Sequence, residues 1–378
     1  MANIYSTDNL FPLFEENEDF LSKQIITYIG NKRGLLTNIN DIIIKVKKEL
    51  NKREISSFDV FSGSGIVARL LKQHSHTLYV NDLELYSKII NSCYLSNIKE
   101  KEYFEIKYIL SQLKQKIKHN LHDGFITKLY APKNDKHITS KDRVFFTKRN
   151  AQYIDTARQE ISLLPYEIQK YFLAPLIYSA SVHNNTSGVF KGFYKNKLGI
   201  GQYGGEGKNA LQRILGNIEL EMPVFSSFFS QVYILQEEAH TAITNIPSVD
   251  FAYLDPPYNQ HPYGSNYFML NLIANYQEPR EISKVSGIPK EWNHSKYNQK
   301  SQAQKTLFSL IEKIRAKNVL ISYNSEGFIK YKEFVKFLSS LGKLEVFSIN
   351  YNTFRGSRNL NKRNLYVKEF LFLLKKES

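Results

Sequence analysis

The sequence contains a single cysteine, Cys93, and this scarcity excludes two kinds of stabilising centre. One thiol cannot form a disulfide within the chain, and a zinc site built on cysteines needs several of them. The histidines do not replace them, because His74, His76 and His183 lack the spacing of metal ligands. We therefore expect no metal site, and a buried Cys93 with no chemical role.

Long apolar runs are also absent. Apolar runs such as residues 42–44 and 370–374 are far shorter than the roughly 20 residues that span a bilayer. Residues 1–22 are polar and acidic, and they lack the basic region and apolar core of a signal peptide. By elimination, the sequence predicts a cytoplasmic protein with no membrane partner.

Negative charge is in short supply. The 378 residues carry 36 Asp and Glu against 51 Lys and Arg, a formal net charge of +15. Such an excess favours a polyanionic partner, although charge alone does not separate DNA from RNA or an acidic membrane. Hydrophobic residues make up 42% of the chain, which is ordinary for a globular protein of about two domains.

The most informative stretch is residues 249–258. Its first six residues are mostly apolar and predict a strand buried on both faces, which then runs into Asp255-Pro256-Pro257-Tyr258. Two consecutive prolines fix φ and remove two N–H donors, so the chain leaves the strand as a stiff, extended bracket. In open α/β sheets, ligands bind at the carboxyl ends of strands. A carboxylate, free carbonyls and an aromatic ring there suit a planar group that bears an exocyclic amine.

A second unit of the same kind begins at residue 55. A strand ending in Asp59-Val60-Phe61 is followed by Ser62-Gly63-Ser64-Gly65 and an apolar helix over 66–71. This is not the dinucleotide fingerprint, because the third glycine is missing. The glycines let the backbone approach a ligand closely, and the following helix N-terminus favours a carboxylate.

Acidic residues follow the next two predicted strands. Asp82 and Glu84 follow the strand over 77–80 and lie 17–19 residues beyond Gly65. An acidic residue at this position can bind ribose hydroxyls, and Asp82 is our first choice and Glu84 the second. The alternative is that both merely cap the next helix. After the strand over 232–235, Glu237 and Glu238 are in the corresponding position, and the choice between them as a ligand contact is open.

The α/β alternation stops between residues 98 and 229. Residues 99–149 carry 13 Lys and Arg against 6 Asp and Glu, and one helix is predicted over 148–163. A polar loop over 183–188 and a glycine-rich stretch over 201–209 follow, and Lys191 and Lys195 lie between them. Small polar side chains on such loops can read base edges while lysines contact phosphates. We expect this mainly helical and loop-rich insertion to bind nucleic acid.

The remainder of the chain returns to alternating elements. Residues 277–300 predict a mobile loop over the cleft, and a helix over 301–316, a strand over 318–323 and a helix over 328–340 follow. Strands near 344–351 and 364–374 predict an antiparallel edge hairpin. Its tip carries Arg355 and Arg358 among four cations, which predicts contact with phosphate.

Four motifs therefore occur in one order: Tyr-x-Gly-Asn-Lys at 28–32, Asp-x-Phe-Ser-Gly-Ser-Gly at 59–65, Asn-Asp-x-Glu at 81–84 and Asp-Pro-Pro-Tyr at 255–258. Together they resemble the Dam-like group of adenine-specific DNA methyltransferases over residues 1–97 and 230–378. The resemblance implies that residues 98–229 are an inserted DNA target-recognition domain, although they match by position and charge only. The resemblance implies a Rossmann-like sheet of seven strands, mostly parallel with an antiparallel edge hairpin. It makes S-adenosylmethionine the cofactor. Its implied neighbours are Tyr28, Gly30, Asn31, Lys32, Asp59, Phe61, Ser62, Gly63, Gly65, Asp82, Glu84 and Glu237 or Glu238.

The resemblance also implies a mechanism. The adenine N6 is a poor nucleophile inside a duplex, so the enzyme swings the nucleotide out of the stack. Tyr258 would stack on the base, while Asp255 and the Pro256 carbonyl would accept the two amino hydrogens. The implied partners are duplex DNA and a cognate restriction endonuclease. Two alternatives remain: methylation of adenine in RNA, and a catalytically silent DNA-binding module on the same scaffold.

Overall fold

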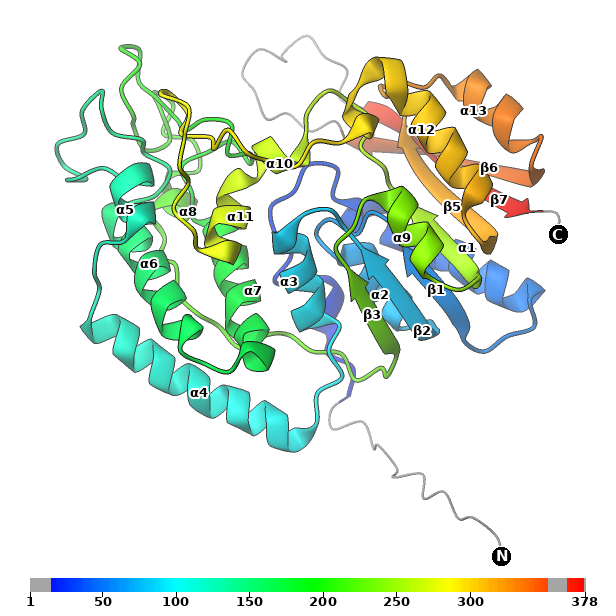
Figure 1. Ribbon diagram of the computed structural model, residues 1–378, viewed down its shortest axis with the longest axis horizontal. Helices are drawn as coiled ribbons and strands as arrows, with labels where there is room; N and C mark the ends of the chain where they lie inside the picture. Colours follow the sequence, from blue (N-terminus) through cyan, green and yellow to red (C-terminus); the bar gives the residue numbers. More distant parts are fainter. Residues whose placement is uncertain (1–14, 353–365, 377–378) are drawn as a thin grey trace, which may run out of the picture.

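A seven-stranded sheet forms the centre of the computed structural model, which describes residues 15–352 and 366–376. The strand order is β3-β2-β1-β4-β5-β7-β6 (Figure 1). Strands β1 to β5 are parallel, and β7 runs antiparallel to both β5 and β6. The predicted mostly parallel sheet with an antiparallel edge pair is confirmed. The strands are β1 (Ile55–Asp59), β2 (Ser75–Asn81), β3 (Gln231–Leu235), β4 (Val249–Leu254), β5 (Ala316–Asn324), β6 (Gly342–Asn352) and β7 (Tyr366–Lys376).

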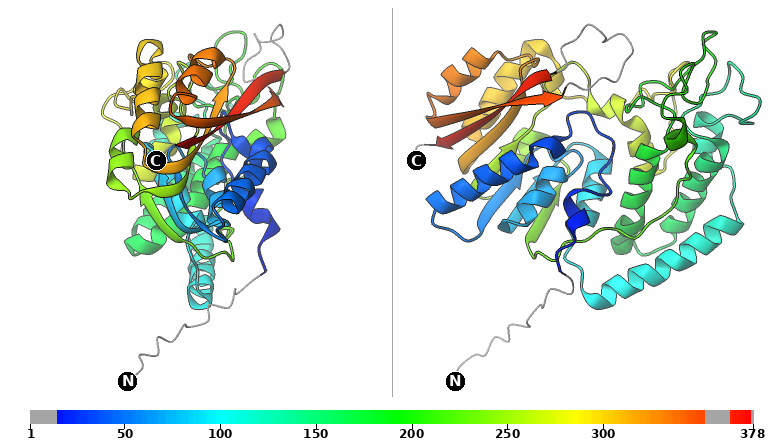
Figure 2. Two further views of the ribbon diagram at one scale, coloured as in Figure 1. Left: turned by 90° about the vertical axis from the view of Figure 1, so that its right-hand side faces the viewer. Right: turned by 180° about the vertical axis from the view of Figure 1, so that it is seen from behind.

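Helices cover both faces of this sheet. The helices α9 (Ala239–Asn245), α12 (Lys300–Lys313) and α13 (Tyr331–Leu338) lie on one face, and α1 (Leu36–Glu49) and α2 (Ile66–Lys72) lie on the other (Figures 1 and 2). Each face has its own apolar cluster, because successive strand residues point to opposite sides. The result is a three-layer α/β arrangement that leaves the strand ends open to a ligand.

Strand β4 lies in the middle of the sheet, and all six of its residues are buried. It pairs in parallel with β1, and Asp59 at the end of β1 is level with Tyr253 in β4. Asp255 follows two residues later. The sheet register therefore brings the two motifs that end at Asp59 and begin at Asp255 to the same edge.

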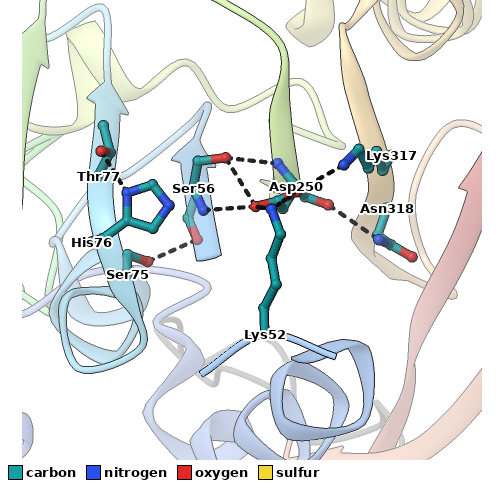
Figure 3. Close-up of polar contacts among 9 residues, drawn as sticks. Lys52, Ser56, Ser75, His76, Thr77, Asp250, Lys317 and Asn318 are labelled. Atoms are coloured by element: carbon teal, nitrogen blue, oxygen red, sulfur yellow. Dashed lines mark hydrogen bonds and ion pairs between the residues drawn. The ribbon is translucent and has the colours of Figure 1, made fainter. Parts of the chain in front are cut away.

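The amino end of β4 is fixed by a separate polar network around Asp250 (Figure 3). Its carboxylate accepts two hydrogen bonds from Lys52 Nζ, at 2.7 and 2.8 Å, and one from Lys317 Nζ at 3.2 Å. The Ser56 amide donates to the same carboxylate at 3.1 Å, which ties β1 to β4. Burial tends to raise the pKa of Asp250, but these hydrogen bonds outweigh it and lower the pKa to about 2.

The insertion over 98–229 consists of helices joined by long loops. Its helix α7 packs against α3 and α11, and the apolar side chains of the insertion belong to the same buried cluster as one face of the sheet. The insertion is therefore anchored on the sheet through helices (Figure 1). The insertion helices are α4 (Glu100–His119), α5 (Phe125–Tyr130), α6 (Lys148–Ser162), α7 (Tyr166–Val182) and α8 (Leu211–Leu215); their neighbours are α3 (Leu85–Tyr94) and α11 (Phe268–Asn275).

Several helices differ from their predicted bounds. The helix predicted over 301–316 ends at Lys313, because β5 already begins at Ala316. The α7 helix was not predicted, since it contains Pro175 and is buried on most sides, which leaves little amphipathic pattern. Four short elements complete the described fold: η1 (Glu18–Leu21), η2 (Lys32–Leu35), α10 (Tyr263–Asn266) and η3 (Lys296–Asn298).

Candidate active site

A cavity of about 700 Å³ lies at the carboxyl ends of the central strands. The segments that follow β1, β2, β3 and β4 line it through Asp59, Asp82, Glu237 and Asp255. The stretch around Lys32 and residues 293–298 complete its wall. The motif that begins at Asp59 and the motif that begins at Asp255 therefore line one cavity.

The tetrapeptide leaves β4 along the rim of this cavity. Asp255 and Pro257 line it directly, whereas Pro256 is buried behind them. The backbone of Tyr258 is fixed, because its carbonyl accepts a hydrogen bond from the Phe328 amide at 3.1 Å. Its ring lies edge-on to Tyr323 at 6.0 Å. The aromatic side chain is thus held beside the carboxylate by β5 and the loop that follows it.

Asp255 carries a strongly perturbed carboxylate. Its Oδ1 lies 3.0 Å from Lys32 Nζ, and its side chain keeps 20% of its exposure. Burial raises the pKa of Asp255 to about 6, although the Lys32 ammonium opposes this shift. The Asp255 carboxylate is therefore ionised at neutral pH and becomes protonated in mild acid.

Asp59 is the least satisfied group of the cavity. Both carboxylate oxygens are buried, and neither has a hydrogen-bond partner among the described residues. Burial and the negative charges of Asp255 and Asp82 raise its pKa well above the ordinary value; the nearby Phe61 and Ala68 amides oppose this only weakly. A buried carboxylate without a partner is costly, so this arrangement calls for a cationic ligand.

The two glycines in the turn after β1 have different structural roles. Gly63 has φ of +50°, and a Cβ there would lie 2.8 Å from the Tyr28 ring. Gly65 has φ of +77°, but it faces Asn91 of α3 rather than the cavity, where a Cβ would lie 2.5 Å from Oδ1. Ser62 and Phe61 line the cavity beside Gly63. Gly63 therefore fits a ligand-side role, and Gly65 serves the packing of α2 on α3.

Asp82 and Glu84 both line the cavity, and each is held by donors. The Asp82 carboxylate accepts from the amides of Gly63 at 2.7 Å and Glu84 at 2.9 Å. The Glu84 carboxylate does not cap α3 but accepts from the side-chain amides of Asn271 and Asn293. Burial raises the pKa of Asp82, and it raises the pKa of Glu84 to about 7. The capping alternative fails for Glu84, which instead joins α11 and the 293–298 segment to the cavity.

Glu237 and Glu238 lie at the far end of the cavity, after β3. Glu238 Oε2 caps α9 by accepting from the His240 amide at 2.8 Å, and Glu237 Oε2 accepts from Asn245 at 2.8 Å. The rings of Phe61 and Tyr297 meet edge to face at 5.1 Å nearby. This end thus combines carboxylates with aromatic walls, which suits a planar base with an amine.

The 28–32 segment forms the opposite wall. The Tyr28 ring stacks on Tyr263 at 4.9 Å and on Tyr267 at 4.7 Å, which fixes it between the cavity and α10. Gly30 takes φ of +75°, and Asn31 accepts from the Arg33 amide to start the short helix η2. All four predicted residues of this segment, Lys32 included, line the cavity.

The residues predicted to contact DNA lie elsewhere. Lys191 is exposed, with Nζ 3.5 Å from His261 Nδ1 in the loop that follows the tetrapeptide. Lys195 lies over the Phe193 ring at 5.0 Å. Neither lysine lines the cavity. Arg355 and Arg358 lie outside the described residues.

One expectation about the polar loop over 183–188 is wrong. Asn184, Asn185 and Thr186 are buried, so their side chains are not available to base edges. The Asn185 amide donates to the carbonyls of Val144 and Gln202, and its oxygen accepts from the Gly204 amide. Here the polar residues satisfy the backbone of neighbouring loops, a use of asparagine that composition does not reveal.

Two groups of the site were missed from the sequence. Glu369 on β7 contacts Lys32 at 3.3 Å, and it is the one carboxylate of that strand, directly before the apolar run over 370–374. Asn293 belongs to the polar segment that was predicted only as a loop over the cleft. The segment does lie there, with Tyr297 buried under it.

Across residues 15–352 and 366–376, no cluster of three or more metal-ligating side chains occurs. Within the same residues, no helix combines the length and the apolar character needed to cross a membrane. Cys93 is buried, as predicted, and burial raises the pKa of its thiol.

Comparison with known proteins gives a consistent assignment. Residues 28–337 match the family model for D12 class N6 adenine-specific DNA methyltransferases. The chain is 30% identical over 363 residues to type II methyltransferase M.FokI of Planomicrobium okeanokoites, which covers 93% of this chain and 52% of that protein. It is 29% identical to M.NlaIII of Neisseria lactamica, over 93% of this chain and 99% of the relative. It is also 29% identical to M.CviAII of Paramecium bursaria Chlorella virus 1, over 92% and 98%.

The chain thus spans about half the length of M.FokI and nearly the whole of the other two relatives. The family match covers the tetrapeptide, the glycine turn and the acidic strand ends that share the cavity. The chain belongs to the D12 class of N6 adenine-specific DNA methyltransferases.

Proposed function

We propose that this chain transfers a methyl group from S-adenosylmethionine to the N6 of an adenine in a specific sequence of duplex DNA, as the modification enzyme of a restriction-modification system. The observation that carries the proposal is the placement of Asp59 and Asp255 in the wall of one cavity. An unpartnered buried carboxylate there faces the same space as the tetrapeptide.

The residues of the cavity fit the cofactor. Asp59 would accept from the α-ammonium of the amino-acid end, and the turn at Gly63 would let the backbone approach the carboxylate. Asp82, or Glu84 as second choice, would take the ribose hydroxyls. Glu237 or Glu238 would meet the adenine amine beside Phe61 and Tyr297. When bound, the cofactor supplies an electrophilic methyl group on a sulfonium.

Asp255 and the Pro256 carbonyl would orient the target amine. The N6 lone pair is delocalised into the adenine ring, so two acceptors that take its two hydrogens draw that pair towards the methyl group. Holding both reactants in line is a proximity effect that can contribute several kcal/mol. The amine must lose one proton on methylation, and the Asp255 carboxylate, whose pKa burial raises to about 6, would accept it.

Tyr258 would stack on the flipped adenine, a contact worth about 1–3 kcal/mol. This offsets the few kcal/mol needed to take a base out of the duplex. The aspartate at position 255 favours adenine over cytosine, whose N4 methyltransferases more often carry serine there.

The insertion over 98–229 is the part of the chain that we assign to target recognition. Its support is position and charge: Lys191 lies against the loop that follows the tetrapeptide, and the Phe190 amide donates to the Asn266 carbonyl of α10 at 2.7 Å. Arg355 and Arg358, outside the described residues, are proposed to contact phosphate.

The decisive experiment incubates the purified protein with labelled S-adenosylmethionine and unmodified genomic DNA, followed by base analysis and mapping of the modified sites. We expect N6-methyladenine within one short sequence. Label in RNA but not in DNA would establish the RNA alternative, and cofactor and DNA binding without transfer would establish the silent module.

Asp255→Ala separates catalysis from binding in the same assay. We expect transfer to be lost while DNA affinity stays near that of the wild type, because Asp255 lines the cavity whereas Lys191 and Lys195, the described residues proposed to contact DNA, do not. Asp41→Ala, an exposed position on α1, is the matched control. Near-normal turnover of Asp255→Ala would remove this carboxylate from the mechanism.

A further inference from the structure

A buried carboxylate of β7 lies behind the tetrapeptide. The side chain of Glu369 is 3% exposed, and the sheet register pairs Glu369 with Asn324 of β5. Its Oε1 accepts from Ser322 Oγ at 2.7 Å, and its Oε2 accepts from Asn324 Nδ2 at 3.1 Å. Two neutral donors from the adjacent strand therefore hold Glu369 in place without any help from a cation.

The cation that it also contacts is Lys32. Its side chain is 5% exposed. Its Nζ donates a hydrogen bond to the Gly30 carbonyl at 3.0 Å and forms ion pairs with Asp255 Oδ1 at 3.0 Å and Glu369 Oε1 at 3.3 Å. These contacts compensate the buried positive charge. Burial lowers the pKa of Lys32, but the two carboxylates outweigh this and raise it well above the ordinary value, which keeps the lysine charged.

This arrangement creates a competition at Asp255. In the proposed reaction its carboxylate must accept a hydrogen from the target amine, yet here Oδ1 is already engaged by Lys32. If Asp255 were the only carboxylate near the ammonium, releasing it would leave a buried charge poorly paired, which is strongly unfavourable. Glu369 and the Gly30 carbonyl provide the alternative, because Lys32 can keep both while Asp255 turns to the base.

We propose that Glu369 is a positioning residue that holds the Lys32 ammonium as a second carboxylate partner, so that Asp255 is free to accept the target amine. The inference rests on the proposed function, since it concerns how Asp255 becomes available for the N6 amine. It assigns a role in the reaction to β7, the antiparallel strand between β5 and β6, which carries no motif of its own.

The pH dependence of turnover reports on this network. The groups that face Asp255 are Lys32 from η2, Glu369 from β7, Asp59 from β1, Tyr253 from β4, Tyr258 beside it and Tyr263 from α10. Lys32 lowers the pKa of Asp255, and the negative charge of Glu369 raises it. Removing Glu369 should therefore move the acid limb of kcat to lower pH, while removing Lys32 should move it to higher pH.

The test compares Glu369→Gln with wild type on a duplex that contains the mapped site. Glutamine keeps the shape but not the charge, so Lys32 should pair more strongly with Asp255 and compete with the target amine for its carboxylate. We expect kcat to fall about 10- to 100-fold, the scale of a misplaced reactive group, with little change in cofactor affinity. We also expect less fluorescence from 2-aminopurine placed at the target adenine, and an acid limb at lower pH.

Two further variants make the result specific. Lys32→Met should shift the acid limb in the opposite direction. Glu345→Gln, on β6, removes a carboxylate that pairs with Lys45 and Lys375 far from Asp255, and it should leave all three readouts at wild-type values. If Glu369→Gln does not fold, Ser322→Ala removes one anchor of Glu369 and should change the same readouts in the same directions, by less.

The inference is overturned if the folded Glu369 or Ser322 variant keeps wild-type kcat, base-flipping signal and acid limb. It is also overturned if only thermal stability falls while these three readouts stay fixed, because Glu369 is then purely structural. Failure of the proposed function is a different result, in which the wild-type protein itself places no methyl group on adenine in DNA.

Discussion

Replacing Asp59 with asparagine should weaken cofactor binding while leaving the free protein at least as stable as the wild type. Asp59 is a buried carboxylate whose two oxygens lack partners among the described residues, with Asp255 and Asp82 as negatively charged neighbours. In the free protein this charge is unfavourable, so a neutral side chain of the same shape removes a cost. With the cofactor bound, the same change removes a charged acceptor from its ammonium.

The magnitude follows from the hydrogen bond that is lost. A hydrogen bond to a charged group contributes about 1.5–3 kcal/mol, which corresponds to a Kd for S-adenosylmethionine that is about 10- to 150-fold higher. Linkage converts this into thermal stability. At a concentration of 100 times the wild-type Kd, the ligand stabilises wild type by about 2.7 kcal/mol, but a variant with a 100-fold higher Kd gains only about 0.4 kcal/mol.

The pH dependence adds a second signature. Because the pKa of Asp59 is raised in the free protein, lowering the pH protonates it and should weaken wild-type binding. Asparagine does not titrate, so the difference in affinity between the two proteins should narrow as the pH falls through that pKa.

Isothermal titration calorimetry with S-adenosylmethionine, at several pH values, measures the affinity, and calorimetric unfolding with and without ligand measures the linkage. Asp41→Asn, at an exposed position of α1, is the control and should match wild type. Wild-type affinity in Asp59→Asn, or a clear loss of stability without ligand, would refute the assignment of Asp59 as the site of the cofactor ammonium.

Three further outcomes are expected. Asp250→Asn should lower the free energy of unfolding at pH 7 by about 1–2 kcal/mol, because Lys52 and Lys317 are partly exposed and recover hydration. The folded pKa of Asp250, about 2, lies below its ordinary value, so this stability is present above about pH 4 and is lost as the pH falls towards 2. The free energies of unfolding of the two proteins, measured with urea, should therefore converge at low pH. A difference in free energy that stays the same at all pH values would contradict this. Gly63→Ala should reduce cofactor affinity, because its Cβ would collide with the Tyr28 ring; an unchanged Kd by calorimetry would show that the turn is not at the ligand. Replacing Lys191 and Lys195 with alanine should weaken DNA binding and reduce the slope of log K against log salt by up to about 1.8, as should the pair Arg355 and Arg358; an unchanged slope for either pair would remove it from the phosphate contacts.

Local patterns were sufficient to predict the sheet and most of its strands. The strand over 249–254 was predicted with the bounds that β4 has, because its residues are buried on both faces and two prolines end it sharply. The turn at 62–65 and the acidic residues after each strand also follow from short stretches of chain. Such signals are local, so they survive without knowledge of the fold.

Two features of the insertion were not predicted correctly, and the reason is physical. Helix α7 is buried against α3, α6 and α11, so its sequence lacks the polar face by which an isolated helix is usually recognised. The buried Asn184 and Asn185 were taken for exposed base-reading groups because composition does not show which backbone groups need a donor. Both errors come from packing between segments that are far apart in the chain.

The sequence by itself determined the chemistry of this protein: a basic chain with an Asp-Pro-Pro-Tyr bracket, a glycine turn and acidic strand ends, in the order of an adenine methyltransferase. Only the tertiary structure decided which carboxylates act together. Register between β1 and β4 brings Asp59 level with the catalytic strand, and pairing of β5 with β7 brings Glu369 to Lys32 across more than 330 residues. Hydrogen bonds between strands and the loss of water around buried charges determine which of these residues come into contact, and no local sequence pattern shows either of them.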